Sequence, residues 1–216
     1  MDDSSPREDS ESSIRRLDSH ISDRLKEIRT YLKITRAQRI LRRYFVMNAF
    51  DGAMTSLGIV IGAYITHIMD PRTVIGVILV GGMAMAVSGF AGTYMTESAE
   101  RVRSLNELED AMLMSLERTI HGEASRFVPI LAGLVDGSAP FLASLPSISA
   151  FALALIGPTP IHNAYLSSTG ASLATLFLLG VFLGRISKSN AIYSGIKMVV
   201  AGMVVTVLAL LINGGL

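Results

Sequence analysis

The sequence contains no cysteine and few charged side chains. Without cysteine the chain can form no disulfide and has no thiolate ligand, so a metal ion would have to bind carboxylate, imidazole, thioether or backbone oxygen. Charged residues make up only 17% of the 216 residues, half of the residues are hydrophobic, and the mean hydropathy is +0.47. This composition is typical of a polytopic membrane protein.

Five apolar stretches are each long enough to cross a membrane as a helix. They are residues 45–64, 73–95, 127–156, 163–184 and 191–212. A helix rises about 1.5 Å per residue, so roughly 20 residues cover about 30 Å of hydrocarbon. The first 44 residues are polar and charged, and we therefore expect no secretory signal peptide. The predicted fold is an all-α polytopic membrane protein with five transmembrane helices.

The region before the first span divides into two parts. Residues 1–13 are polar and acidic and are predicted to be disordered. Residues 14–43 combine apolar side chains at helical spacing with eight basic residues between positions 24 and 43. This pattern predicts a basic amphipathic helix on anionic lipid headgroups, with a short coiled coil across a dimer as the alternative. We expect transmembrane helices 1 and 2 in residues 44–96, an acidic segment in 97–126 and helices 3–5 in 127–216.

The distribution of basic residues predicts how the chain is oriented. Eleven of the 19 Lys and Arg residues precede the first span, whereas the loops on the opposite side carry only Arg72. Basic residues gather on the cytoplasmic side of membrane proteins. The N-terminus and residues 97–126 are therefore predicted to be cytoplasmic, and the C-terminus is predicted to lie on the opposite side of the membrane.

Two carboxylates lie inside apolar stretches, where burying an ionised side chain costs roughly 3 kcal/mol or more. Asp51 lies near the start of the first span, and Asp136 lies in the third span between Pro129 and Pro140. Because proline removes a backbone donor, we expect the third span to be broken or bent near Asp136. A carboxylate in a low-dielectric site can exchange a proton for a cation, so both acids are candidates for a translocation path.

Residues 97–126 form a short acidic segment with high helix propensity. At about 100° per residue, most of its acids fall within roughly 160° of one another on a helix, while Glu109 points the opposite way. The acids on the shared side are Glu97, Glu100, Glu107, Asp110 and Glu117. Divalent cations take carboxylate oxygen, and carboxylates from facing helices hold iron or manganese in bundles. The segment is thus a predicted metal-binding region, with an ordinary solvated charged face as the alternative.

Methionine and histidine supply further candidate ligands. Met54 follows Asp51 by about one helical turn, and Met85 lies in the second span. Both are predicted metal ligands, although most methionines in apolar helices only fill space. His67 and His162 lie at the predicted outer ends of the spans, where imidazole could help to release a cation or pass a proton.

Two short motifs occur in the first two spans: NAFDGAMT at 48–55, followed by Leu57-Gly58, and SGFAGTY at 88–94. With the acidic segment after them and the stretch 178–202, they resemble the vacuolar iron transporter family. The resemblance covers the chain from about residue 43 to the C-terminus, in order and with five spans. Two positions depart from the family pattern, because Gly89 stands where the family usually has Met and Thr93 where it has Glu.

The resemblance implies a homodimer that exports iron(II), or else manganese(II), from the cytoplasm in exchange for protons. Asp51 would then be the carboxylate of the translocation path, and the acids after the second span would collect the ion. From the chemistry of buried carboxylates, we expect the proton to return on Asp51 or Asp136. The ion is cargo, so no permanently bound cofactor is expected. The expected partners are the ion, membrane lipids and a second copy of the chain, with no nucleic acid and no enzymatic activity.

Two other functions remain open from the residues. A membrane metal sensor without transport would use the same acidic segment. An intramembrane aspartyl protease would use Asp51 and Asp136 as a pair, and it requires both carboxylates within a few ångströms so that they share a proton.

Overall fold

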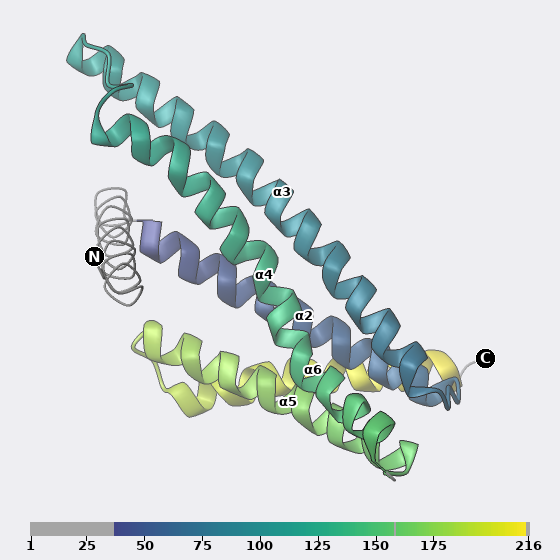
Figure 1. The fold of residues 1–216 in the computed structure, drawn as a ribbon. Helices are drawn as coiled ribbons and strands as arrows, with labels where there is room; N and C mark the ends of the chain where they lie inside the picture. The colour runs from purple at the N-terminus through teal and green to yellow at the C-terminus, as the bar shows by residue number, and fades with distance from the viewer. Residues whose placement is uncertain (1–36, 158, 215–216) are drawn as a thin grey trace, which may run out of the picture.

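The computed structural model describes residues 37–157 and 159–214, and this part of the chain folds into five long helices. They are α2 (Ala37–Ile65), α3 (Pro71–Met112), α4 (Ile120–Ile156), α5 (Ile161–Ile186) and α6 (Ala191–Gly214). Consecutive helices run in opposite directions, so the bundle has two ends (Figure 1). At one end α3 and α4 continue beyond the other helices as a hairpin, which we call the α3–α4 hairpin.

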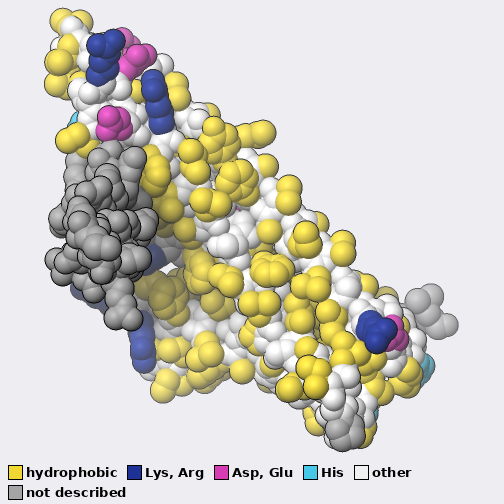
Figure 2. Space-filling model, viewed as in Figure 1, with side chains coloured by type: hydrophobic (Ala, Val, Ile, Leu, Met, Phe, Trp, Pro, Cys, Tyr) yellow, Lys and Arg dark blue, Asp and Glu magenta, His cyan; other side chains and the backbone are white. Residues whose placement is uncertain are grey.

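All five helices are long and apolar enough to cross a membrane. Large apolar side chains such as Val80, Val87 and Leu211 point outward and are strongly exposed. Figure 2 shows hydrophobic side chains spread along the flank of the molecule, while charged side chains gather toward its ends. This arrangement confirms the predicted all-α fold, in which the described chain has five helices long and apolar enough to cross a membrane.

The predicted segments before the first span lie mostly outside the described residues, which begin at position 37. Residues 37–43, the last part of the predicted surface helix, belong to the beginning of α2. Residues 97–126 do not form a separate unit. They cover the end of α3, the turn that follows Met112 and the beginning of α4.

The beginning and the end of α3 follow from local chemistry. Asp70 is the N-cap: its carboxylate accepts hydrogen bonds from the backbone N–H groups of Arg72 at 3.2 Å and Thr73 at 3.3 Å. The Thr73 hydroxyl also donates to this carboxylate, and these hydrogen bonds hold the pKa of Asp70 below its usual value. At the other end, α3 stops at Met112 because Leu113 adopts a left-handed conformation with φ of 55°.

The central helix of the bundle is α4, which packs against α2, α3 and α5. It remains a single helix although it contains three prolines, so of the two predicted outcomes near Asp136, a break or a bend, the break does not occur. The surrounding packing provides the reason. Gly52 of α2 lies so close to the backbone of Pro140 that a Cβ at position 52 would collide with it. Neighbouring helices that fit this tightly support a proline-containing span in lipid.

Buried hydroxyl groups join α2, α4 and α5 inside the bundle. The Oγ atom of Ser147 lies 3.3 Å from that of Ser56 and 2.6 Å from that of Ser172. In lipid, close packing of small residues and interhelical hydrogen bonds hold helices together. These contacts therefore fix α2 against α4, and with it the side chains that α2 directs toward α3.

Candidate functional site

Asp136 lies at the centre of a buried polar cluster formed by three helices. It is only 3% exposed. Asn48 of α2 donates a hydrogen bond through Nδ2 to Oδ1 of Asp136, and Thr93 of α3 donates through Oγ1 to Oδ2 at 2.6 Å. Gly89 leaves room beside this carboxylate, since a Cβ at position 89 would lie 3.2 Å from Oδ2. Both donors to Asp136 are thus uncharged side chains.

Polar contacts continue from Asp136 toward the α3–α4 hairpin. Asn48 Nδ2 also lies 3.3 Å from the backbone oxygen of Tyr44, and the Tyr44 hydroxyl donates to Oε1 of Glu97 at 3.0 Å. Oε2 of Glu97 lies 3.5 Å from Nη2 of Arg101. We call these connected residues the polar series: Asp136, Thr93, Asn48, Tyr44, Glu97 and Arg101.

The polar series ends beside a cavity of about 330 Å³ at the base of the α3–α4 hairpin, which we call the polar cavity. Its wall includes the carboxylates of Glu97 and Glu100, the guanidinium of Arg101 and the imidazole of His121. Both members of the Glu97–Arg101 pair are largely buried, with side chains 9% and 14% exposed. The series therefore connects a charged cavity near one end of the bundle to a carboxylate among the spanning helices.

Asp51 differs from Asp136 because it is exposed in the single chain, although Gly52 beside it is buried. The two carboxylates are near enough to interact electrostatically. Within the described chain, no hydrogen bond joins them, and both oxygens of Asp136 are already bonded to Asn48 and Thr93. An aspartyl protease needs two carboxylates that share a proton, and this arrangement does not favour that function.

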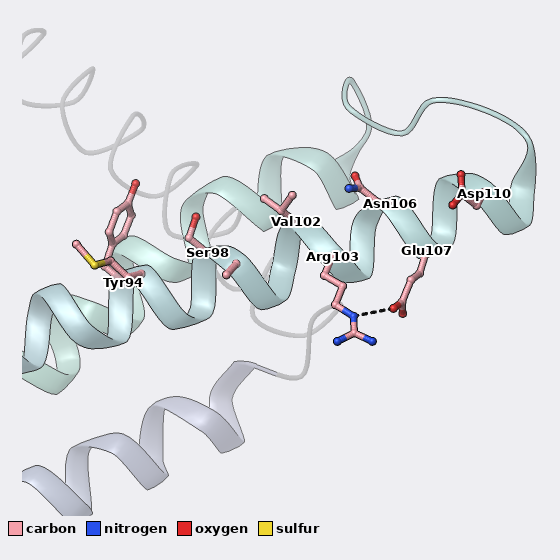
Figure 3. A pocket seen from close by; sticks show the side chains of 9 residues that line it. Tyr94, Ser98, Val102, Arg103, Asn106, Glu107 and Asp110 are labelled. Atoms are coloured by element: carbon pink, nitrogen blue, oxygen red, sulfur yellow. Dashed lines mark hydrogen bonds and ion pairs between the residues drawn. The ribbon is translucent and has the colours of Figure 1, made fainter.

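The predicted acidic ligands on α3 line two different cavities. Glu97 and Glu100 line the polar cavity, whereas Glu107 and Asp110 line a second cavity along α3. There the Arg103 Nε atom lies 2.9 Å from Oε1 of Glu107, and both side chains are exposed to solvent (Figure 3). Among the residues that the structure describes, no three His, Asp or Glu side chains come together as a metal site.

The prediction that Glu117 lies on the same helical face as the other acids is wrong. Because α3 ends at Met112, Glu117 lies in the turn before α4 rather than on the helix. Glu109 helps to form this turn by accepting a hydrogen bond from the backbone N–H of Leu116 at 2.6 Å. A projection that assigns about 100° to every residue assumes that the helix continues, so it cannot detect where the helix ends.

The two predicted methionine ligands have ordinary packing roles in the single chain. Met54 packs against a buried apolar cluster that includes Ala53 and Leu57 of α2 and Leu176 of α5. Met85 is half-buried on α3. Neither observation requires a metal ion, because methionine commonly fills such spaces.

The two histidines at the far end of the bundle lie in one place. His67 and His162 both line a cavity of about 340 Å³ between the α2–α3 turn and the start of α5. The ring centroids of His162 and Tyr64 are 5.8 Å apart. The two histidines predicted at the outer ends of the spans therefore line one cavity, at the opposite end of the bundle from the polar cavity.

Sequence reasoning did not predict four members of the polar series as site residues: Tyr44, Asn48, Thr93 and Arg101. A signal for them exists in the spacing, because Tyr44 and Asn48 are four residues apart, as are Glu97 and Arg101. Residues four apart lie on the same side of a helix. A search for polar residues at this interval within apolar helices would have found them.

Comparison with known proteins places the chain in a family. No family model matches it, and no solved structure matches it. The chain is 34% identical over 175 residues to the uncharacterized protein MJ0645 of Methanocaldococcus jannaschii, across 79% of this chain and 87% of the archaeal protein. Similarity of this extent covers most of both chains, and this protein therefore belongs to the same family as the archaeal one.

Proposed function

We propose that this protein is a divalent metal transporter that moves iron(II), or manganese(II), out of the cytoplasm in exchange for protons. The observation that carries the proposal is the polar series, a connected set of buried polar groups inside helices apolar enough to span a membrane. Ionisable residues at membrane depth are costly, and they mark ion and proton paths in transporters. The resemblance to the vacuolar iron transporter family supports the same function.

In this proposal the ion first meets the carboxylates at the polar cavity. Glu97 and Glu100 offer oxygen ligands, which iron(II) and manganese(II) accept. Asp51 and Asp136 then act at membrane depth. In this proposal Asp136 carries the returning proton. Asn48 and Thr93, which are both uncharged, hold its carboxylate in place by hydrogen bonds, so that its position does not depend on a bound cation.

The exposed face of α2 supports the proposal of a homodimer. Asp51 and Thr55 are exposed, and Gly58 and Gly62 follow on the same side of the helix at helical spacing. A carboxylate facing lipid is unfavourable, whereas small residues let a second helix approach closely. A second copy of the chain on this face would enclose two Asp51 side chains in one cavity.

Cysteine substitution tests this dimer, because the natural chain contains no cysteine. We expect Thr55→Cys or Gly62→Cys to give disulfide-linked dimers under mild oxidation in membranes, since a Cβ at position 62 has open space around it. Val80→Cys is the control, because Val80 is 68% exposed on α3 and is expected to face lipid. A dimer through this face would be contradicted if Val80→Cys formed as much cross-linked dimer as the α2 variants. It would also be contradicted if neither Thr55→Cys nor Gly62→Cys formed any cross-linked dimer.

Proteoliposomes test transport itself. With an acidic lumen, we expect manganese(II) or iron(II) added outside to enter the vesicles while the lumen becomes more alkaline. A metal-sensitive dye and a pH-sensitive dye inside the vesicles report the two fluxes, and protein-free vesicles are the control. Binding of the ion without flux would favour a membrane metal sensor. Metal flux without any change in lumenal pH would contradict the exchange for protons.

A further inference from the structure

The environment of Arg101 suggests a role that the pairing with Glu97 alone does not explain. One terminal nitrogen of Arg101 lies 3.5 Å from Oε2 of Glu97, which is a long contact for a charged pair. The Nε atom is buried and has no hydrogen-bond partner among the described residues. Buried donors are normally satisfied, so the guanidinium is held less firmly than its burial would suggest.

The space around this guanidinium is large enough for a hydrated ion. The polar cavity has a volume of about 330 Å³, whereas one water molecule occupies about 30 Å³ of the liquid. Among the described residues, its charged wall consists of two carboxylates, Glu97 and Glu100, against the guanidinium of Arg101, with the imidazole of His121 nearby. This balance favours a cation over an anion as the ligand.

The carboxylate oxygen of Glu97 that does not bond to Tyr44 determines where such an ion would bind. Oε1 of Glu97 already accepts the hydrogen bond of Tyr44, so Oε2 is the oxygen that faces a positive charge. In the structure that charge is Arg101. An arriving divalent cation would need the same oxygen, and it would therefore compete with the arginine for one position.

We propose that the polar cavity is a binding site for a hydrated divalent cation, with Glu97 and Glu100 as its ligands and Arg101 as a built-in counter-ion that the arriving metal displaces. This inference rests on the proposed function and adds a mechanism of regulation. Without a metal ion, Arg101 keeps the buried Glu97 compensated, because an uncompensated buried charge is strongly destabilising. With a metal ion, the competing arginine weakens binding, so that the ion can leave toward Asp136, as conduction through a selective path requires.

The test compares manganese(II) binding by the purified full-length protein with that of Arg101→Gln, measured by electron paramagnetic resonance of the free ion. We expect the variant to bind manganese(II) more tightly by on the order of tenfold, because one competing charge is removed. Arg103→Gln is the matched control, since it removes the same charge from the same helix at an exposed position, where Arg103 pairs with Glu107 and interacts less strongly with Glu100, so that a clearly smaller gain is expected. Arg101→Lys restores the charge and is expected to return the affinity to that of the natural protein.

Several results would overturn the inference. These are an unchanged or weaker affinity in Arg101→Gln, an equal gain in Arg103→Gln, and a gain that persists when Glu97→Gln is added to Arg101→Gln. If Arg101→Gln does not fold, Glu97→Gln alone decides, because it must lose manganese(II) binding at the cavity and unchanged binding would refute the site. Binding in detergent requires no flux. A gain in affinity without vesicle transport would therefore support this inference and contradict the transporter.

Discussion

Asp51→Asn is expected to reduce metal uptake into proteoliposomes by on the order of tenfold or more, which corresponds to a loss of at least about 1.4 kcal/mol of stabilisation. Asparagine keeps the shape of the side chain and removes its charge, so the ion loses an anionic ligand. Asp51 is exposed in the single chain, and the substitution should therefore leave the fold of the protomer unchanged. Initial uptake rates of manganese(II) under a pH gradient provide the measurement.

The matched control for this variant is Asp70→Asn. Asp70 is also an exposed aspartate, but it lies in the turn between α2 and α3. Asparagine is as good an N-cap as aspartate, so α3 keeps its cap. Unchanged uptake by Asp51→Asn would refute the proposed role of Asp51. Loss of uptake together with loss of the dimer on size exclusion would instead assign Asp51 to the dimer interface.

The membrane made the coarse fold predictable from the sequence. Lipid leaves the backbone only a few ways to satisfy its hydrogen bonds, and a spanning helix needs roughly 20 apolar residues. Five such stretches in the sequence therefore became five helices in the structure. The helical character of the residues after the second span was predicted from their propensity, but the end of α3 at Met112 was not, because neither apolar length nor propensity marks it.

Burial of the two membrane acids could not be predicted, because it depends on contacts between distant parts of the chain. Asp51 and Asp136 both have apolar neighbours in the sequence, so the sequence does not show which of the two carboxylates is buried. The structure buries Asp136 and exposes Asp51, because α2 places Gly52 against Pro140 of α4. That contact turns Asn48 toward Asp136 and leaves Asp51 on the outer side of the helix.

The two departures from the resembled family gain a common explanation in the structure. Gly89 and Thr93 both lie beside Asp136: a Cβ at position 89 would lie only 3.2 Å from Oδ2, and the Thr93 hydroxyl donates a hydrogen bond to the same oxygen. At position 93 the family pattern has a glutamate, which would place a carboxylate on α3. In this chain the carboxylate at that place comes from α4. In the described part of this chain, the polar cluster around Asp136 holds one carboxylate, which α4 supplies.

Thr93→Glu is accordingly expected to destabilise the protein strongly. The new carboxylate would lie against Asp136, whose Oδ2 is now 2.6 Å from the Thr93 hydroxyl. Like charges at this distance cannot both ionise, and an uncompensated buried charge costs about 3–5 kcal/mol. We expect a lower yield of folded protein and a lower temperature of aggregation. Both are measured by size-exclusion chromatography of heated samples in detergent.

Adding Asp136→Asn to Thr93→Glu should recover most of the lost stability. The double variant again holds one carboxylate, and the new amide on α4 can donate a hydrogen bond to the new carboxylate on α3, as the threonine hydroxyl now donates to Asp136. Residues in contact show coupling energies of about 0.5–3 kcal/mol in a double-mutant cycle. A double variant as unstable as the sum of the single variants would show no coupling, and the cluster would then depend on the carboxylate of α4 rather than on a single shared charge.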